Sequence, residues 1–76
     1  MERIGVECRF EAHGRVRVRR IQIGETWQTV AQGRQWQDES GRHILVMLPG
    51  ERIEELLLSA GDLTWWLVTR PRRTTL

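Results

Sequence analysis

The chain has 76 residues, of which 39% are hydrophobic, and a formal net charge of +2, so it suits one small folded domain and not a disordered tail. Its single cysteine excludes an intrachain disulfide, and no secretory or membrane-spanning segment is evident, so we expect a cytoplasmic protein. All twelve basic residues are arginines, whose planar side chains pair with carboxylates or phosphates and stack on aromatic rings.

The first part of the chain predicts a β-hairpin. Residues 3–11 alternate between apolar and polar side chains, which is the period of a half-buried strand. Residues 12–14 form a turn in which Gly14 can adopt a positive φ, and a second strand is expected over residues 15–23. The first strand is expected to point four apolar side chains inward: Ile4, Val6, Cys8 and Phe10.

The three-residue loop predicts which residues face one another in this hairpin. Phe10 should lie opposite Val16, and Glu7 should lie opposite Arg19, so that apolar meets apolar and opposite charges meet. The apolar phase of the second strand shifts by one residue at Arg19-Arg20. We therefore predict a β-bulge there, which keeps the later apolar residues in the core and bends the strand.

The middle of the chain predicts two further strands around a turn. Residues 27–36 contain two tryptophans and Gly33, and a glycine within a strand pattern marks a bulge or a tight bend. Residues 38–41 (DESG) are a turn sequence. Residues 42–48 carry apolar side chains on both faces, which indicates a central strand. Its inward residues should be Ile44, Val46 and Leu48.

Residues 51–60 fit two structures. Four apolar residues at helical spacing, with Gly61 as a stop, favour a helix by propensity. Both flanking segments favour strands, however, and residues 63–69 (LTWWLVT) need a pairing partner, so we predict a strand over residues 52–58. Residues 71–76 are expected to form a flexible basic tail after a single β-barrel domain, residues 1–70.

Five or six short strands with regular turns predict an all-β fold, a small barrel or a compact antiparallel meander. The chain also resembles a bacterial family of small Trp-rich domains of unknown function, over about residues 15–70. The resemblance implies an SH3-like barrel and an association with error-prone, Y-family-like DNA polymerase proteins, and it brings no catalytic residue to this chain. It is carried by Trp27, Gly33-Arg34, Trp36, Glu55-Leu56 and Trp65-Trp66-Leu67.

The four tryptophans divide into core residues and candidate binding residues. Large rings dominate the stability of a chain this small, so we expect Trp27 and Trp65 in the core. Neighbouring residues in a strand face opposite ways, so Trp65 and Trp66 cannot both enter one core. We therefore take Trp36 and Trp66 as candidate protein-binding residues, because an exposed tryptophan can hold a partner side chain.

The arginines form a candidate nucleic-acid-binding stripe along the second strand. The simpler alternative is a solvated strand face whose arginines pair with Glu7 and Glu11 across the sheet. A net charge of only +2 favours this alternative, because dedicated nucleic-acid binders carry a larger basic excess. The candidate nucleic-acid-binding residues are Arg15, Arg17, Arg19, Arg70 and Arg72.

No constellation of residues indicates an enzyme, a cofactor or a metal site. Cys8, His13 and His43 lack the spacing of zinc ligands, and Cys8 is better interpreted as a small buried residue. The glutamates at positions 51, 54 and 55 are interpreted as a solvated sheet edge that discourages strand addition.

We therefore predict a non-catalytic interaction module that docks onto a protein partner, in DNA repair or translesion synthesis. The alternative is direct nucleic-acid binding through the arginine-rich strand face.

Overall fold

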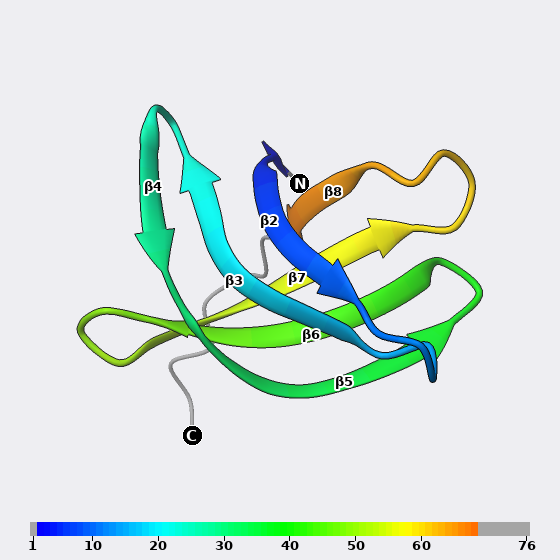
Figure 1. Cartoon of the computed structure of the whole chain (residues 1–76). Helices are drawn as coiled ribbons and strands as arrows, with labels where there is room; N and C mark the ends of the chain where they lie inside the picture. Colours follow the sequence, from blue (N-terminus) through cyan, green and yellow to red (C-terminus); the bar gives the residue numbers. More distant parts are fainter. Residues whose placement is uncertain (1, 69–76) are drawn as a thin grey trace, which may run out of the picture.

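The computed structural model describes residues 2–68, and all of their regular structure is strand. Five strands form one antiparallel sheet in the order β1-β8-β7-β6-β5, and three form a second in the order β2-β3-β4 (Figure 1). The predicted all-β class is therefore confirmed. None of these residues belongs to a helix that could cross a membrane. The strands are β1 (Glu2–Arg3), β2 (Gly5–Phe10), β3 (Val16–Ile23), β4 (Thr26–Thr29), β5 (Ala31–Asp38), β6 (Gly41–Leu48), β7 (Arg52–Ser59) and β8 (Trp65–Val68).

Two bent segments join the sheets into a small barrel. Only Ile4 separates β1 from β2, and only Val30 separates β4 from β5, so each pair acts as one long strand that changes sheet (Figure 1). The Ile4 N–H donates to the Trp65 carbonyl at 3.2 Å, and the Val30 N–H donates to the Arg19 carbonyl at 3.1 Å. With each bent segment counted as one strand, every strand pairs with the next, and β8 pairs with β1. This closure is the predicted antiparallel barrel.

The hydrophobic core lies between the two sheets and receives side chains from both. The three residues of β6 that were expected to point inward are buried, so that prediction is confirmed. The partly buried side chains of Cys8 and Trp65 pack against the same core, as expected. The buried cluster consists of Val16, Val18, Ile21, Ile44, Val46, Leu48 and Leu56.

The hairpin of β2 and β3 has the predicted loop and the predicted register at its turn. The bulge expected in β3 is also present, because the register shifts between Glu7 and Cys8. Its position corrects one pair: Glu7 lies opposite Arg20, and not opposite Arg19 as expected. Arg19 is the extra residue of the bulge, which returns Ile21 to the core.

The hairpin of β5 and β6 contains the predicted glycine bulge and a turn that requires glycine. The register shifts between Gln32 and Gln35, so that Gly33 and Arg34 together occupy the place opposite Leu45. Gly41 begins β6 with φ +142°, and a Cβ atom there would overlap the carbonyl oxygen of Leu58. No other residue fits this position without a shift of the β7 backbone.

The ambiguous segment is a strand, which confirms the prediction over residues 52–58. β7 lies between β6 and β8, so it is not a sheet edge. This corrects the interpretation of Glu54 and Glu55 as a solvated edge, because Glu55 is only 6% exposed and Glu54 is half-buried. The expected tail over residues 71–76 lies outside the described residues.

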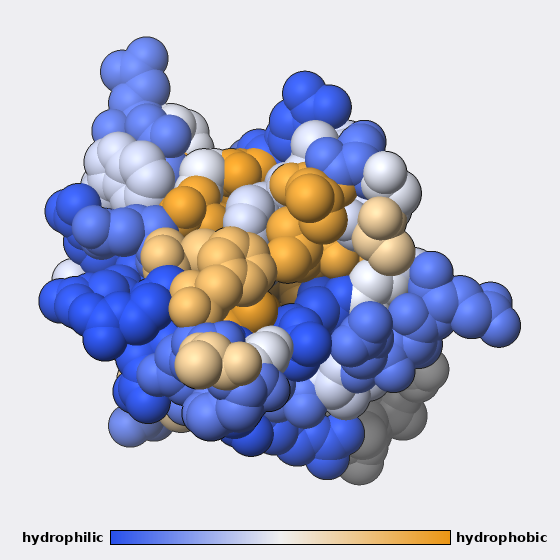
Figure 2. Space-filling view, turned by 45° about the vertical axis from the view of Figure 1, so that its right-hand side comes forward, coloured by the Kyte–Doolittle hydropathy of each residue, from blue (hydrophilic) through white to orange (hydrophobic). Residues whose placement is uncertain are grey.

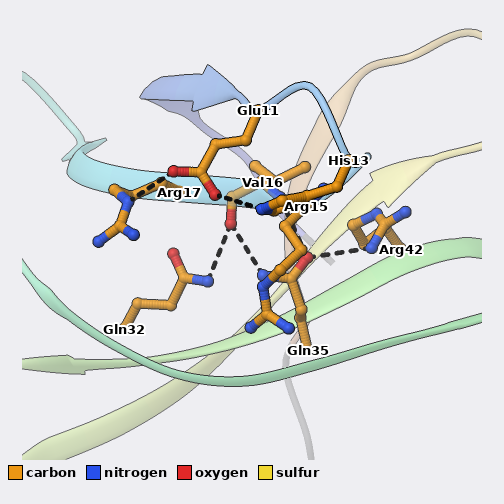
Figure 3. Close-up of polar contacts among 8 residues, drawn as sticks. All are labelled: Glu11, His13, Arg15, Val16, Arg17, Gln32, Gln35 and Arg42. Carbon is orange, nitrogen blue, oxygen red and sulfur yellow. Dashed lines mark hydrogen bonds and ion pairs between the residues drawn. The ribbon is translucent and has the colours of Figure 1, made fainter.

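Two glutamines seal the barrel where β4 has turned away from β3. β4 pairs only with the second half of β3, so backbone groups of Val16 and Val18 face β5 without a strand partner. Gln32 accepts from the Val18 N–H at 2.6 Å and donates to the Val16 carbonyl at 2.9 Å. Gln35 accepts from the Val16 N–H at 3.2 Å and donates to the Val16 carbonyl at 2.8 Å (Figure 3). These side-chain amides therefore replace the hydrogen bonds of a missing strand, and we call Gln32 and Gln35 the glutamine seam.

Candidate functional site

The outer face of the five-stranded sheet is mainly apolar, although its inner face already forms the core. Residues paired across an antiparallel sheet point to the same side, so three cross-strand rows define this face. The middle of this face is buried, with Glu55 6% and Leu57 7% exposed, and its large exposed apolar residues are Met47 and Ile53. We call this surface the apolar outer face; it consists of Ala31, Trp36, His43, Leu45, Met47, Ile53, Glu55, Leu57, Trp66 and Val68.

Both predicted protein-binding tryptophans lie in one row of this face. Trp36 pairs with His43 across β5 and β6, and Trp66 pairs with Leu57 across β7 and β8. Because His43 and Leu57 also pair with each other, the row crosses four strands and separates the tryptophans by roughly 14 Å, three strand spacings. The sequence predicted the two residues separately, and the strand order brings them together.

Guanidinium groups lie at both ends of the row. The Arg34 guanidinium lies 5.1 Å from the ring centroid of Trp36, and that of Arg3 lies 5.3 Å from the ring of Trp66. The Trp66 indole N–H donates to the Thr64 hydroxyl at 2.8 Å. These contacts hold both rings, which are half-buried, in defined positions.

His43 is clamped between two carboxylates beneath Trp36. Its Nδ1 lies 2.7 Å from Glu55 Oε2 and its Nε2 lies 3.0 Å from Asp38 Oδ1, and its ring stacks on Trp36 with centroids 5.1 Å apart. Burial of the ring opposes its charge, but the hydrogen bonds to Asp38 and Glu55 outweigh burial and raise the pKa of His43. The same bond to His43, followed by the backbone N–H of Ser40, lowers the pKa of Asp38. Both ring nitrogens are thus engaged by carboxylates.

An apolar hollow of about 180 Å³ opens at the other end of the apolar outer face. It lies beside the bulge at Gly33, where the absent side chain leaves space, and Leu45 forms part of its lining. Met47 and Ile53 pair across β6 and β7 at its rim and are 41% and 60% exposed. Sequence reasoning missed these two residues as candidates, although apolar residues on both faces of residues 42–48 were the signal.

Trp27 is not a core residue, which corrects the prediction. It is 42% exposed and pairs with Gln22, so it lies on the outer face of the three-stranded sheet. The reason is the phase of β3: Ile21 and Ile23 point inward, and every residue opposite Gln22 must point outward. Trp65 packs against the core and Trp66 does not, as the alternation required.

The predicted arginine stripe is exposed, and acidic partners neutralise only part of it. Arg17 forms an ion pair with Glu11 at 3.2 Å, which matches the expected pairing across the sheet. Glu7 pairs at 2.6 Å with Arg20, a contact that lowers the pKa of Glu7. Within residues 2–68, neither Arg15 nor Arg19 forms an ion pair with a carboxylate. The other two candidates, Arg70 and Arg72, lie outside the described residues.

A further apolar area lies on the face of the molecule that Figure 2 brings forward, surrounded by hydrophilic residues. Phe10, on the inward phase of β2, is nevertheless 64% exposed, which corrects its expected place in the core. β2 is an edge strand of its sheet and Phe10 ends it, so no strand covers the ring on that side. Leu63, in the loop between β7 and β8, is also exposed.

The described residues offer no metal centre: within residues 2–68, no three His, Cys, Asp or Glu side chains are grouped to hold an ion. Burial raises the pKa of the Cys8 thiol, which does not favour a reactive thiolate. Comparison of the chain with family models, with curated proteins and with solved structures gives no match. The resemblance to a Trp-rich family stays a prediction, and the function is inferred from the geometry of the outer faces.

Proposed function

We propose that the protein is a non-catalytic docking module that binds a protein partner through the apolar outer face. The observation that carries this proposal is the second apolar face of the five-stranded sheet, with Trp36 and Trp66 in one row and Met47 and Ile53 exposed beside it. Exposed apolar faces with aromatic residues are typical of protein interfaces, and tryptophans often contribute most of the binding energy.

The chemistry of the face suggests what the partner presents. The apolar hollow fits an aliphatic or aromatic side chain, and Arg3 and Arg34 at the ends of the row are placed to attract carboxylates. We therefore expect an apolar segment flanked by acidic residues. The family resemblance suggests that this segment belongs to an error-prone DNA polymerase protein in the cytoplasm of a bacterium.

The test is a binding titration with the purified Y-family-like polymerase of the same organism, by isothermal titration calorimetry. Ile53→Asp should weaken binding at least 10-fold, because it places a charge at the rim of the hollow at a cost of more than about 1.4 kcal/mol. Trp66→Ala should weaken binding similarly, because tryptophans are among the residues that most often contribute strongly to an interface.

Leu63→Asp is the matched control, because Leu63 is an exposed aliphatic residue outside the apolar outer face. It should leave the affinity unchanged, and circular dichroism should report the same fold for all variants. Wild-type affinity in Ile53→Asp, or an equal loss in Leu63→Asp, contradicts the proposed face. Unfolding of Trp66→Ala would instead mean that Trp66 stabilises the barrel, and Ile53→Asp then decides the question alone.

A further inference from the structure

The outer face of the three-stranded sheet carries more positive charge than the whole chain. Its outward rows contain five arginines and two glutamates, a net charge of +3, whereas the complete chain has a formal net charge of +2. Arg9 and Arg17 lie directly opposite each other, a like-charge pair that opposes folding and that the barrel does not need. We call this surface the basic face; its charged residues are Glu7, Arg9, Glu11, Arg15, Arg17, Arg19 and Arg20.

An exposed aromatic ring, that of Trp27, lies on the basic face. Trp27 projects from β4, and its ring reaches so far across the sheet that a Cβ atom on Gly5 of β2 would lie 3.3 Å from it. The Arg20 guanidinium lies 5.4 Å from the ring centroid and is itself held by Glu7. Trp27 therefore offers a positioned, partly exposed π surface beside fixed positive charge.

A polar groove of about 560 Å³ lies along β3, lined by residues of β3 and by Glu7, Thr29, Val30 and Gln32. Arg17, Arg19 and Arg20 line it, with Gln32 at its far side. Its volume lies within the range of about 300–1,000 Å³ that is usual for sites of small organic ligands, so one nucleotide fits. Arg20 belongs both to the groove and to the stack on Trp27, so a base on the ring would place its phosphate near the arginines.

We propose that the basic face binds single-stranded nucleic acid, with Trp27 stacking on one base and Arg17, Arg19 and Arg20 contacting the backbone. A base must leave its duplex to lie on an aromatic ring, which is why the occupant is single-stranded. Among residues 2–68, the arginine ion pairs of this face are Arg17–Glu11 and Arg20–Glu7. Their arginine side chains are 64% and 48% exposed, so phosphates can replace the carboxylates at little cost. This site lies on the opposite sheet from the apolar outer face and goes beyond the docking function.

The experiment is a titration of the full chain against a fluorescein-labelled oligothymidylate of about 12 nucleotides, followed by anisotropy at several salt concentrations. Binding should weaken as salt rises, with a slope of log K against log salt of about −0.7 for each phosphate contacted. Trp27→Ala should weaken binding roughly 5- to 100-fold, the effect of losing one stacked base. The double variant Arg17→Ala/Arg19→Ala should reduce the slope by about 1.4.

Arg52→Ala is the control for charge, because Arg52 is exposed on β7 of the other sheet and also pairs with a glutamate. It should change neither the affinity by more than about 2-fold nor the slope. Ile53→Asp should also leave oligonucleotide binding intact, which separates this site from the docking face.

Any one of the following results would overturn the proposal. These are no binding at low salt, equal affinity of wild type and Trp27→Ala, and equal affinity for a duplex of the same length. Displacement of the oligonucleotide by polyglutamate at equal charge concentration would also overturn it, because the basic face would then be a site for acidic peptides. Urea midpoints of each variant show whether the fold persists.

Discussion

At the scale of single residues, His43 contacts both a buried carboxylate of β7 and an aromatic ring of the apolar outer face. It stacks on Trp36 and donates to Glu55, whose carboxylate lies largely away from water on a central strand. A buried carboxylate needs such partners, because its desolvation is otherwise costly. His43 therefore stabilises the barrel in its charged form, and its pKa is raised accordingly.

This clamp predicts how stability depends on pH. Since the folded-state pKa of His43 is raised above its ordinary value of 6.5, the stabilisation is complete below about pH 6.5 and is lost as the pH rises through the folded pKa. The lowered pKa of Asp38 acts at the opposite limit: its contribution is present above its ordinary pKa of 3.8 and is lost as the pH falls through the folded value. The free energy of unfolding in urea should thus decrease as the pH rises above about 6.5.

The matched variant is His43→Gln, which retains a donor but does not titrate. The decrease in unfolding free energy over this pH range should be smaller in the variant than in the wild type. Equal pH profiles for the two proteins would show that the clamp does not operate. The other histidine, His13, is exposed and is present in both proteins, so any contribution that it makes is the same in both pH profiles.

At the scale of elements, the barrel depends on β-bulges and bent segments, which curve the strands while the hydrogen bonds between strands continue. The bulges at Arg19 and Gly33 curve β3 and β5, and the bent segment at Val30 carries the chain from one sheet to the other. Where these bends part β3 from β5, Gln32 and Gln35 complete the bonding of the exposed backbone. These glutamine side chains thus make the hydrogen bonds that a neighbouring strand would otherwise make.

The glutamine seam predicts site-specific losses. Gln32→Ala and Gln35→Ala should each lower the free energy of unfolding by about 1–3 kcal/mol, because part-buried backbone groups of β3 lose their partner. In hydrogen-exchange NMR, the Val18 amide should exchange faster in the first variant and the Val16 amide in the second. Gln37→Ala is the control, since Gln37 is exposed and bonds only to the Arg42 side chain among the described residues. An equal loss in the control would contradict the seam.

At the scale of the whole molecule, the two sheets share one core and should unfold together. Ile21 from the three-stranded sheet and Ile44 from the five-stranded sheet belong to the same buried cluster. A chain this small has only about 3–5 kcal/mol of stability from such a core, so neither sheet can persist alone. The two outer faces, one apolar and one basic, are therefore held by one folding unit.

Paired substitutions test this shared core. Ile21→Val and Ile44→Val should each lower the free energy of unfolding by about 1 kcal/mol, since each removes one fully buried methylene group. Tryptophan fluorescence and far-ultraviolet circular dichroism should report one coincident transition in both variants. Ile53→Val, at an exposed site, should change stability by less than about 0.5 kcal/mol. Separate transitions for the two signals would mean that the sheets unfold independently.

The patterns that local chemistry governs were predicted well from the sequence. Alternation of apolar residues identified the inward face of β6, and turn residues identified the hairpin loops. The phase shift at Arg19-Arg20 and the glycine at position 33 predicted both bulges. The exact pair Glu7–Arg20 was missed, because a bulge displaces every later partner by one residue.

The sequence by itself determined that the chain folds as strands and which residues of each strand share a face, because alternation depends only on the backbone of one strand. Only the tertiary structure decided which faces meet. The strand order placed Trp36 and Trp66 in one row and buried Glu55 on a central strand. It also left Trp27 on the outer face of the three-stranded sheet. These outcomes depend on contacts between distant segments, and periodicity within a segment carries no information about its neighbours in space.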